Sequence, residues 1–431
     1  MSRYAVVLGK AVRSVARLRG GGTALPGLVV ERLDPGFMGR TLAQLPRGVA
    51  VISGTNGKTT TTKMVTELLE SQGLRVFTNR TGSNYSRGVV AALLGAVDRH
   101  GRLDADVAVL ELDEAHGTRF VQEVAPRYTL LLNVMRDQLD RFGEIDTTAR
   151  LLEHIADATS DTVVLNREDP RVAHVAEHLP ATTRARYFGL SRKVRPTFPS
   201  DDDLYGAVPA VASPDQAADV TLDDFDDSGD GQVDPAASFT VGGATYRTRL
   251  HVRGVHNLAN AAAALELARV IAGDGAPAPR LVEALGEVTP AFGRGERLLV
   301  GGRPLELVLV KNPGGFRLSL RSFPAAGHAT MIAINDQHAD GRDTSWLWDV
   351  DFASLRAEGV QEVTGIRAFD MALRLAYDDV RVGHVTSDLS KALHHLLEAS
   401  GERPMRVYCT YTAMLALRRR LGAMTRVEAI A

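Results

Sequence analysis

Apolar and polar positions alternate in a regular rhythm from residue 49 onward. Short apolar runs such as "GVAVIS", "DVAVLEL" and "YTLLLNV" are predicted as buried strands, because each is only a few residues long and nearly continuous. The segments between them, such as "KTTTTKMVTELLESQG", have the longer period of an amphipathic helix. Strands that alternate with helices predict an α/β fold with a parallel, doubly wound sheet.

The same rhythm restarts near residue 298, with apolar runs from "LELVLV" to "MRVYCT". It predicts a second, Rossmann-like α/β domain. A chain of 431 residues is also too long for one ordinary core. We therefore expect a helical lead-in at 1–48, a central domain at 49–297 and a C-terminal domain at 298–431.

Residues 196–246 interrupt the rhythm. The stretch is rich in aspartate, and residues 201–234 contain no Lys or Arg. We interpret most of it as a solvated, mobile insertion in the central domain. Its end runs into "ASFTVGGATYRTRLHV", where two alternating runs around Gly-Gly predict a hairpin. The alanine-rich "NLANAAAALELARVIAG" that follows predicts a helix.

Composition narrows the possible classes of protein. The chain is 45% hydrophobic and 24% charged, with a net charge of −2, which is typical of a soluble globular protein and gives no positive field for nucleic acid. No apolar run reaches the roughly 18 residues of a membrane span. The N-terminal segment is basic, and Lys10 and Arg13 interrupt the apolar core that a signal peptide would need. We interpret it as an amphipathic helix that ends at Gly20–Gly22, compatible with a transient membrane contact, rather than as a signal peptide.

The stretch "GTNGKTTTTK" lies between a predicted strand and a predicted helix. Small residues there let backbone N–H groups point at phosphate oxygens, and the helix N-terminus adds partial positive charge. Lys58 would reach the terminal phosphates of a nucleotide, and the hydroxyl of Thr59 would bind Mg²⁺. The loop is shorter than the general P-loop pattern, which has a glycine where this chain has Ile52. The alternative interpretation is a glycine-rich turn with an incidental lysine.

Four further stretches place polar side chains where a ligand crevice is expected, and one of them, "NVMRDQLDRFG", puts Asn133 directly after a predicted strand. "LELDEAHG" puts Glu111 at the end of a buried strand, where it could bind Mg²⁺ or belong to a solvated acidic loop. "LNREDPRV" puts Asn166 and Asp169 after another strand. "GVHNLANAAAA" puts His256 and Asn260 at the start of a helix, where an asparagine could cap the helix or read an adenine edge.

These blocks, together with "NVMRDQLDRFGE" and "FGRGER", resemble the Mur ligase superfamily and occur in order over residues 50–297. Within it the chain looks most like the MurT-type subunits of lipid II isoglutaminyl synthase. That finer likeness rests on "RGGGTALPG" with "RLDP", on "NRTGSNYSRG", and on Gln138, where amino-acid-adding Mur ligases usually have His. It also rests on the C-terminal blocks "KNPGGF" and "NDQHADGRDTSWLWDVDF".

The resemblance implies a reaction, a partner and a place in the cell. ATP activates the α-carboxylate of D-glutamate in lipid II as an acyl phosphate, and ammonia converts it to the amide of D-isoglutamine. The ammonia comes from a separate glutaminase subunit of the GatD type. The lipid tail of the substrate implies work in the cytoplasm at the inner face of the membrane, with only peripheral membrane contact.

The resemblance also implies site residues. Thr59 and Glu111 would hold Mg²⁺. The nucleotide would be bound by Gly54, Thr55, Asn56, Gly57, Lys58, Thr59, Asn166, Asp169, His256, Asn260 and Arg294. Some MurT-type proteins carry a four-cysteine zinc ribbon in the insertion of the central domain. Because residues 196–246 contain no cysteine and no histidine, we predict no structural zinc.

The chain offers no evident glutaminase nucleophile. Its single cysteine, Cys409, excludes an intramolecular disulfide and is compatible with a reducing cytosol. It lies at the end of an apolar strand, so we interpret it as a small core residue. The resemblance implies instead that an aspartate of "DGRDTSWLWDVDF" completes the Cys–His pair of the partner. Asp349 is the first candidate and Asp343 the second.

The two tryptophans of that block also have two interpretations. Tryptophans are common interface anchors, but the block could equally be a core strand with an aspartate-rich turn. Two other functions also stay open at this point. One is an amino-acid-adding ligase of the muramyl or folylpolyglutamate kind. The other is a nucleotide-binding scaffold that regulates a partner without chemistry.

Overall fold

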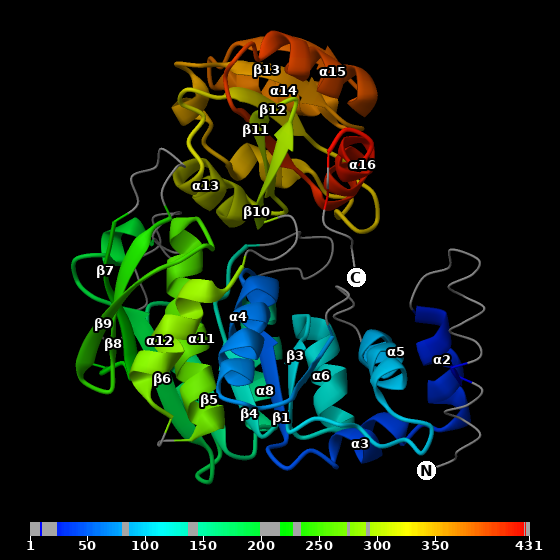
Figure 1. Ribbon diagram of the computed structural model, residues 1–431, viewed down its shortest axis with the longest axis vertical. Coiled ribbons are helices and arrows are strands. Elements are labelled where there is room, and N and C mark those ends of the chain that lie inside the picture. Colours follow the sequence, from blue (N-terminus) through cyan, green and yellow to red (C-terminus); the bar gives the residue numbers. More distant parts are fainter. Residues whose placement is uncertain are drawn as a thin grey trace.

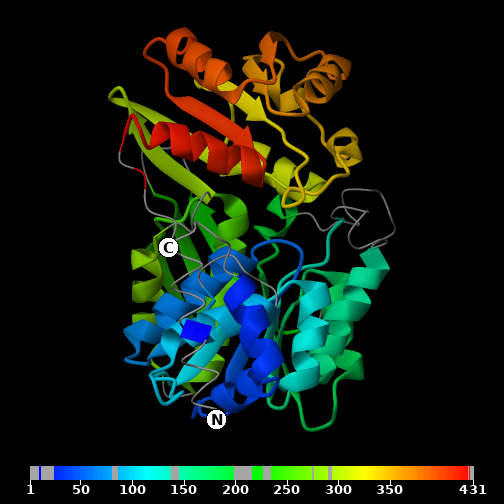
Figure 2. The same ribbon diagram turned by 90° about the vertical axis from the view of Figure 1, so that its right-hand side faces the viewer.

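The computed structural model describes residues 9–10, 24–79, 86–136, 145–198, 216–226, 234–273, 276–289, 294–425 and 427. They form two α/β bodies, one above the other (Figures 1 and 2). The lower body is built on a nine-stranded sheet and the upper body on a six-stranded sheet. The predicted fold class, a large and mostly parallel sheet followed by a second α/β unit, is confirmed.

The large sheet has the strand order β2-β3-β1-β4-β5-β6-β7-β8-β9. The strands from β2 to β7 in this order run parallel, so their carboxyl ends meet at one edge, and β8 runs antiparallel to both β7 and β9. The predicted hairpin is thus confirmed. The strands are β1 (Val49–Ser53), β2 (Val76–Thr78), β3 (Val107–Glu111), β4 (Tyr128–Leu131), β5 (Thr162–Asn166), β6 (Arg184–Leu190), β7 (Val220–Asp226), β8 (Ala236–Val241) and β9 (Ala244–Arg249).

Helices cover both faces of this sheet because its central strands are apolar on both sides. In β1, Ala50 and Ile52 pack into one core, and Val49 and Val51 pack into the other. The first core is closed by three helices that lie side by side in Figure 1: α4 (Lys58–Ser71), α11 (Val255–Ala272) and α12 (Ala278–Glu287). The second is closed by α3 (Phe37–Leu42), α5 (Ser86–Ala96), α6 (Glu114–Glu123), α8 (Ile145–Asp157) and α9 (Pro170–His174), with α2 (Ala24–Leu33) against α5.

The upper sheet has the order β10-β11-β15-β12-β13-β14 and begins at Arg294, slightly before the expected boundary at 298. Apart from the antiparallel β10–β11 hairpin, its strands are parallel. They are β10 (Arg294–Val300), β11 (Arg303–Leu309), β12 (Ala329–Ala333), β13 (Val360–Thr364), β14 (Val382–Thr386) and β15 (Met405–Cys409). One face carries α13 (Pro313–Ser322) and α14 (Ala368–Tyr377), the other α15 (Leu389–Ala399) and α16 (Tyr411–Leu421).

The acidic stretch contains a strand that we did not expect. β7 pairs with β6 and β8, and the side chains of Val220 and Leu222 are fully buried. The expectation of a solvated insertion is therefore wrong for this segment. Asp223 is accommodated at the strand because the hydroxyls of Thr221 and Thr240 donate to its carboxylate. The other aspartate-rich segments, 199–215 and 227–233, lie outside the described residues.

The predicted N-terminal amphipathic helix also falls almost entirely outside the described residues, apart from Gly9 and Lys10. Among the helices that the structure describes, none combines the length and the hydropathy needed to cross a membrane.

Candidate active site

The glycine-rich loop lies at the carboxyl edge of the large sheet, between β1 and α4. Gly54 and Gly57 have φ values of +132° and +92°, a region that side chains disfavour. A Cβ on Gly57 would also lie 2.6 Å from Oδ1 of Asn260, so glycine lets α11 approach the loop. No side chain caps α4 at Gly57. Because the first N–H groups of a helix have no partner within the helix, this end favours an anion.

Asn133, which follows β4, fixes the first half of the loop. The N–H of Thr55 donates to its backbone oxygen at 3.0 Å, and the N–H of Asn56 donates to its Oδ1 at 2.9 Å. Its own Nδ2 donates to the backbone oxygen of Asn56 at 3.0 Å. The N–H groups of Thr55 and Asn56 are thus committed to the protein, which leaves the second half of the loop, from Gly57, to face an anion.

Lys58 is 7% exposed and folds back onto this loop. Its Nζ donates to the backbone oxygens of Gly54 and Thr55 and lies 3.4 Å from both carboxylate oxygens of Glu114. Glu114 is itself 2% exposed, at the first turn of α6. The ammonium is therefore held at the loop by groups that a phosphate could replace.

Thr59 and Glu111 are brought together as predicted. The hydroxyl of Thr59 donates to Oε1 of Glu111 at 2.9 Å. Asn79, at the end of β2, holds the backbone of Glu111 from both sides: its Nδ2 donates to the Glu111 oxygen at 2.8 Å, and its Oδ1 accepts from the Glu111 N–H at 2.9 Å. A hydroxyl and a carboxylate at a phosphate loop are hard oxygen donors, so these residues fit Mg²⁺.

A pocket opens beside the loop, between the two bodies. It has apolar walls with a few polar groups, which is typical of a small-molecule site. Of the predicted nucleotide-binding residues, six line it: Asn56, Gly57, Asn166, Asp169, His256 and Asn260. Its other lining residues are Leu132, Asn133, Met135, Glu168, Phe188, Gly189, Leu190, Phe198, Ala259, Leu309, Lys311, Gly315, Leu318 and Ser319.

The remaining predicted residues lie around this pocket. Gly54, Thr55, Lys58 and Thr59 belong to the loop and the first turn of α4, and Glu111 contacts Thr59. Arg294 is the first residue of β10 and pairs with Val308, next to the pocket residue Leu309. The predicted site thus comes together at the junction of the two bodies.

Asn166 and Asp169 have hydrogen bonds that tie the pocket's rim to the fold. Nδ2 of Asn166 donates to the backbone oxygen of Leu132 at 2.8 Å. Asp169 caps α9, and its Oδ2 accepts from the N–H of Val134 at 2.7 Å. Burial raises the pKa of Asp169 to about 6, although backbone N–H groups and Arg171 act in the opposite direction. Both side chains position the segments that follow β4 and β5.

Two residues of the upper body donate hydrogen bonds to the glycine-rich loop. Nζ of Lys311 donates to the backbone oxygen of Thr55 at 3.0 Å, and Nδ2 of Asn312 donates to Oδ1 of Asn56 at 3.1 Å. Asn312 also caps α13 through the N–H of Gly315. In the sequence, "KNPGGF" served only as a mark of the family, and this second lysine was not predicted. The available signal was a lysine directly between a predicted strand and a helix.

Of the two candidate aspartates, Asp343 precedes the short helix η3 (Ser345–Asp349) and Asp349 is its last residue. Oδ1 of Asp343 accepts from the N–H of Ser345 at 2.8 Å, so this carboxylate already stabilises the turn. Asp349 is exposed, and its backbone oxygen accepts from Arg317 of α13. Because α13 also lines the pocket through Gly315, it connects the pocket to this turn.

The two tryptophans have different environments. Trp346 is 5% exposed in the core, as the core interpretation predicts, whereas Trp348 is 49% exposed, as an interface anchor would be. Trp348 packs edge-on against Tyr377 with their rings 5.1 Å apart, and the guanidinium of Arg374 lies over its ring. Arg374 also donates to the backbone oxygen of Val350 at 2.6 Å, which fixes the turn that carries Asp349.

An exposed apolar surface continues from Trp348 along α14. It consists of Phe369, Leu373 and Tyr377, spaced four residues apart on one side of the helix, and we call it the α14 stripe. Their exposed fractions are 69%, 54% and 70%. A contiguous row of exposed apolar side chains of this kind is typical of an interaction surface.

Comparison with known proteins identifies the family. Residues 52–268 match the family described as Mur ligase middle domain, which is half of the chain. The chain belongs to the Mur ligase family. Residues 309–414 of this Mur ligase match the family described as MurT ligase C-terminal, and the match begins at the segment that contacts the phosphate loop.

Relatives and solved structures agree with this placement. This Mur ligase is 28% identical to the lipid II isoglutaminyl synthase (glutamine-hydrolysing) subunit MurT of Streptococcus pneumoniae, over 97% of this chain and 96% of that protein. The subunit of the same name from Staphylococcus aureus is also 28% identical, over 92% and 93%. The predicted MurT-type resemblance is confirmed.

The fold is that of MurF ligases. MurF from Acinetobacter baumannii superposes with a TM-score of 0.69 at 18% identity, over 93% of this chain and 80% of that one. MurF from Thermotoga maritima, solved in complex with ADP, superposes with a TM-score of 0.67 at 16% identity, over 91% and 82%.

Cys409 of this Mur ligase is fully buried on β15, between β11 and β12. Burial raises the pKa of its thiol, so the reactive thiolate is suppressed. The core interpretation of Cys409 agrees with this environment.

Proposed function

We propose that this Mur ligase is the synthetase subunit of a lipid II isoglutaminyl synthase, which amidates the α-carboxylate of D-glutamate in lipid II at the expense of ATP. One observation carries the proposal. The region matching the MurT ligase C-terminal family supplies Lys311 to the phosphate loop of a Mur ligase middle domain. Relatives aligned over nearly the whole chain are named as subunits of that enzyme.

The phosphate loop would hold the nucleotide. Lys58 would exchange the loop carbonyls and Glu114 for the terminal phosphates, and Lys311 would bring a second positive charge from the upper body. Thr59 and Glu111 would hold Mg²⁺, which neutralises phosphate charge when it is bound. The apolar walls formed by Phe188 and Leu190, near Asn166 and His256, would receive the adenine.

The reaction then proceeds in two steps. A carboxylate oxygen of the substrate attacks the γ-phosphorus, its bond to ADP breaks, and an acyl phosphate forms. Ammonia attacks the acyl carbon, the phosphate leaves with the C–O electron pair, and a proton from nitrogen is lost to solvent. The two lysines stabilise the negative charge that accumulates on the phosphoryl oxygens, and the junction of the two bodies positions the reactants.

Ammonia would come from a GatD-type glutaminase bound to the upper body. This chain's only cysteine is buried, so a nucleophile for glutamine must come from elsewhere. Asp349 is exposed beside Trp348 and the α14 stripe, so a subunit seated on that stripe would meet its carboxylate. The carboxylate would orient the partner's histidine and stabilise its protonated form.

The experiment that tests the function is an assay of ADP release by the purified chain with lipid II. Ammonium should support release together with amidated product, without any partner. Release that requires an amino acid instead of ammonium would favour an amino-acid-adding ligase. No turnover under any of these conditions would favour a nucleotide-binding scaffold.

The lipid substrate places the proposed reaction in the cytoplasm, at the inner face of the membrane.

Leu373→Asp is expected to abolish co-purification with the glutaminase subunit, because a charge in the middle of the α14 stripe would have to be desolvated in the interface. Ammonium-driven amidation should stay unchanged. Leu299→Asp is the matched control, since Leu299 is 64% exposed on β10, at the opposite edge of the upper sheet. Equal binding by both variants in a pull-down would place the interface elsewhere.

Cys409→Ala is expected to leave both ammonium-driven and glutamine-driven amidation within about twofold of wild type. The thiol is part of the core, and its loss should lower the free energy of unfolding by about 1 kcal/mol. Rates are measured with the glutaminase partner present and stability by urea denaturation. Loss of only the glutamine-driven reaction would show that Cys409 takes part in ammonia production.

A further inference from the structure

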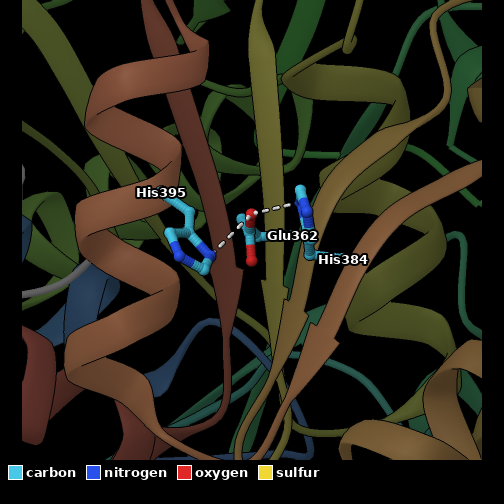
Figure 3. A group of neighbouring side chains, drawn as sticks. All are labelled: Glu362, His384 and His395. Atoms are coloured by element: carbon cyan, nitrogen blue, oxygen red, sulfur yellow. Dashed lines mark ion pairs between the residues drawn. The ribbon is translucent and has the colours of Figure 1, made fainter.

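Three side chains far apart in sequence meet on the upper sheet, remote from the phosphate loop. Glu362 of β13 lies directly across from His384 of β14, and His395 of α15 reaches the same point (Figure 3). Nδ1 of His384 is 3.4 Å from Oε1 of Glu362, and Nδ1 of His395 is 3.8 Å from it. Both imidazoles point at the carboxylate from opposite sides in Figure 3.

Within the part of the chain that the structure describes, the carboxylate of Glu362 lacks the hydrogen bonds that a buried carboxylate normally has. Its side chain is 0% exposed, and among the described residues neither of its carboxylate oxygens has a hydrogen-bond partner. Nδ1 of His395 also has none among them. Burial raises the pKa of Glu362, while the two histidines act in the opposite direction. Because buried carboxylates are normally hydrogen-bonded or bound to a cation, this arrangement points to a missing positive partner.

We propose that Glu362, His384 and His395 form a binding site for a divalent transition-metal ion of the zinc type. Two imidazole nitrogens and one carboxylate oxygen are a known ligand set for Zn²⁺. Bonds of about 2.0–2.1 Å to a tetrahedral ion place ligand atoms about 3.3–3.4 Å apart. The two separations to Glu362, 3.4 Å and 3.8 Å, lie close to this, and all three ligand atoms lie within 4.8 Å of one another.

The ion would keep one coordination position open to water. The side chains of His384 and His395 are 68% and 44% exposed, so the site faces solvent on one side and a metal ion can enter. It would cross-link β13, the edge strand β14 and α15. It lies on the α15 face of the sheet, whereas the α14 stripe belongs to the opposite face. We therefore assign it to the stability of the upper body, and it does not depend on the proposed function.

This site was not predicted from the sequence. The expectation of no structural zinc rested on the lack of a cysteine ribbon in residues 196–246, and this proposal departs from it. The three ligands here are too far apart in sequence to form a recognisable spacing. Only the parallel pairing of β13 with β14 and the packing of α15 bring them together.

Titration of the full-length, chelator-treated protein with Zn²⁺ tests the proposal. Calorimetry is expected to give one more bound ion per chain for wild type than for Glu362→Gln or His384→Ala, or a Kd at least about tenfold lower at that site. Co²⁺ as a probe should give visible absorption bands of a low-coordinate ion in wild type alone. Zn²⁺ should raise the melting temperature of wild type more than that of either variant.

His394→Ala is the matched control. His394 precedes His395 on α15, but it is exposed and paired with Glu398, so its loss should leave stoichiometry and affinity unchanged. Circular dichroism checks that each variant is folded, and Glu362→Gln keeps the shape of the buried side chain. Equal Zn²⁺ binding by wild type, Glu362→Gln and His384→Ala would overturn the proposal, as would an equal loss in His394→Ala.

Discussion

Lys58→Ala is expected to abolish amidation of lipid II, whether the nitrogen comes from ammonium or from glutamine. The ammonium of Lys58 is the buried cation held at the phosphate loop, and in the proposed reaction it stabilises the charge on the transferred phosphoryl group. Removing one preorganised electrostatic partner of this kind costs about 10²–10³-fold in rate. The measurement is the rate of amidated lipid II formation by mass spectrometry, with each nitrogen source in turn.

Lys63→Ala is the control for this prediction. Lys63 lies on the same helix, but its Nζ contacts Thr289 and Glu67 at the surface, so both reactions should stay close to wild type. Full ammonium-driven amidation by Lys58→Ala would contradict the assigned role of the loop.

Asp349→Asn is expected to abolish only the glutamine-driven reaction. The exposed carboxylate is proposed to orient the histidine of the glutaminase, and an amide in its place stabilises the wrong tautomer, at a cost of about 10³–10⁴-fold in glutaminase rate. Ammonium-driven amidation should be unchanged, because Asp349 does not line the pocket. Both rates are measured with the purified complex.

Asp343→Asn and Asp351→Asn are the comparison variants for this prediction. Asp343 already accepts the N–H of Ser345, and Asp351 accepts the N–H of Ala353, so either change should weaken a turn without removing a catalytic group. A glutamine-specific loss in Asp343→Asn but not in Asp349→Asn would move the role to the second candidate. Parallel loss of both reactions in Asp349→Asn would show that the separation of roles is wrong.

The buried strands were predictable because they are apolar on both faces. Runs such as "VAVI" in β1 and "VAVLE" in β3 are short and almost entirely apolar, as expected of a strand that is buried on both faces of a sheet. β6, β7, β10 and β14 were not predicted. β7 has only two buried residues, Val220 and Leu222, together with three aspartates, and β14 has no buried residue, so neither carries a strong hydrophobic signal. Their pairing is determined by neighbouring strands rather than by their own composition.

The site was predictable where one short stretch carries the chemistry. The glycines, Lys58 and Thr59 form a local signal, and Glu111 follows from its place at a strand end. Asn133 was expected at this edge and Lys311 had a local signal, but their contacts with the loop were not predictable, because the loop lies about 80 and 250 residues away along the chain. Such contacts require the strand order and the seating of the upper body on the lower one.

Transfer of oxygen from the substrate carboxylate to phosphate tests the central claim most directly. The claim is that the phosphate loop activates a carboxylate for attack by ammonia. Lipid II labelled with a heavy oxygen isotope in the α-carboxylate of D-glutamate is incubated with the protein, ATP and ammonium, and the released inorganic phosphate is analysed by mass spectrometry. The account predicts one labelled oxygen in the phosphate for each amide formed. Amide formation with unlabelled phosphate would contradict it.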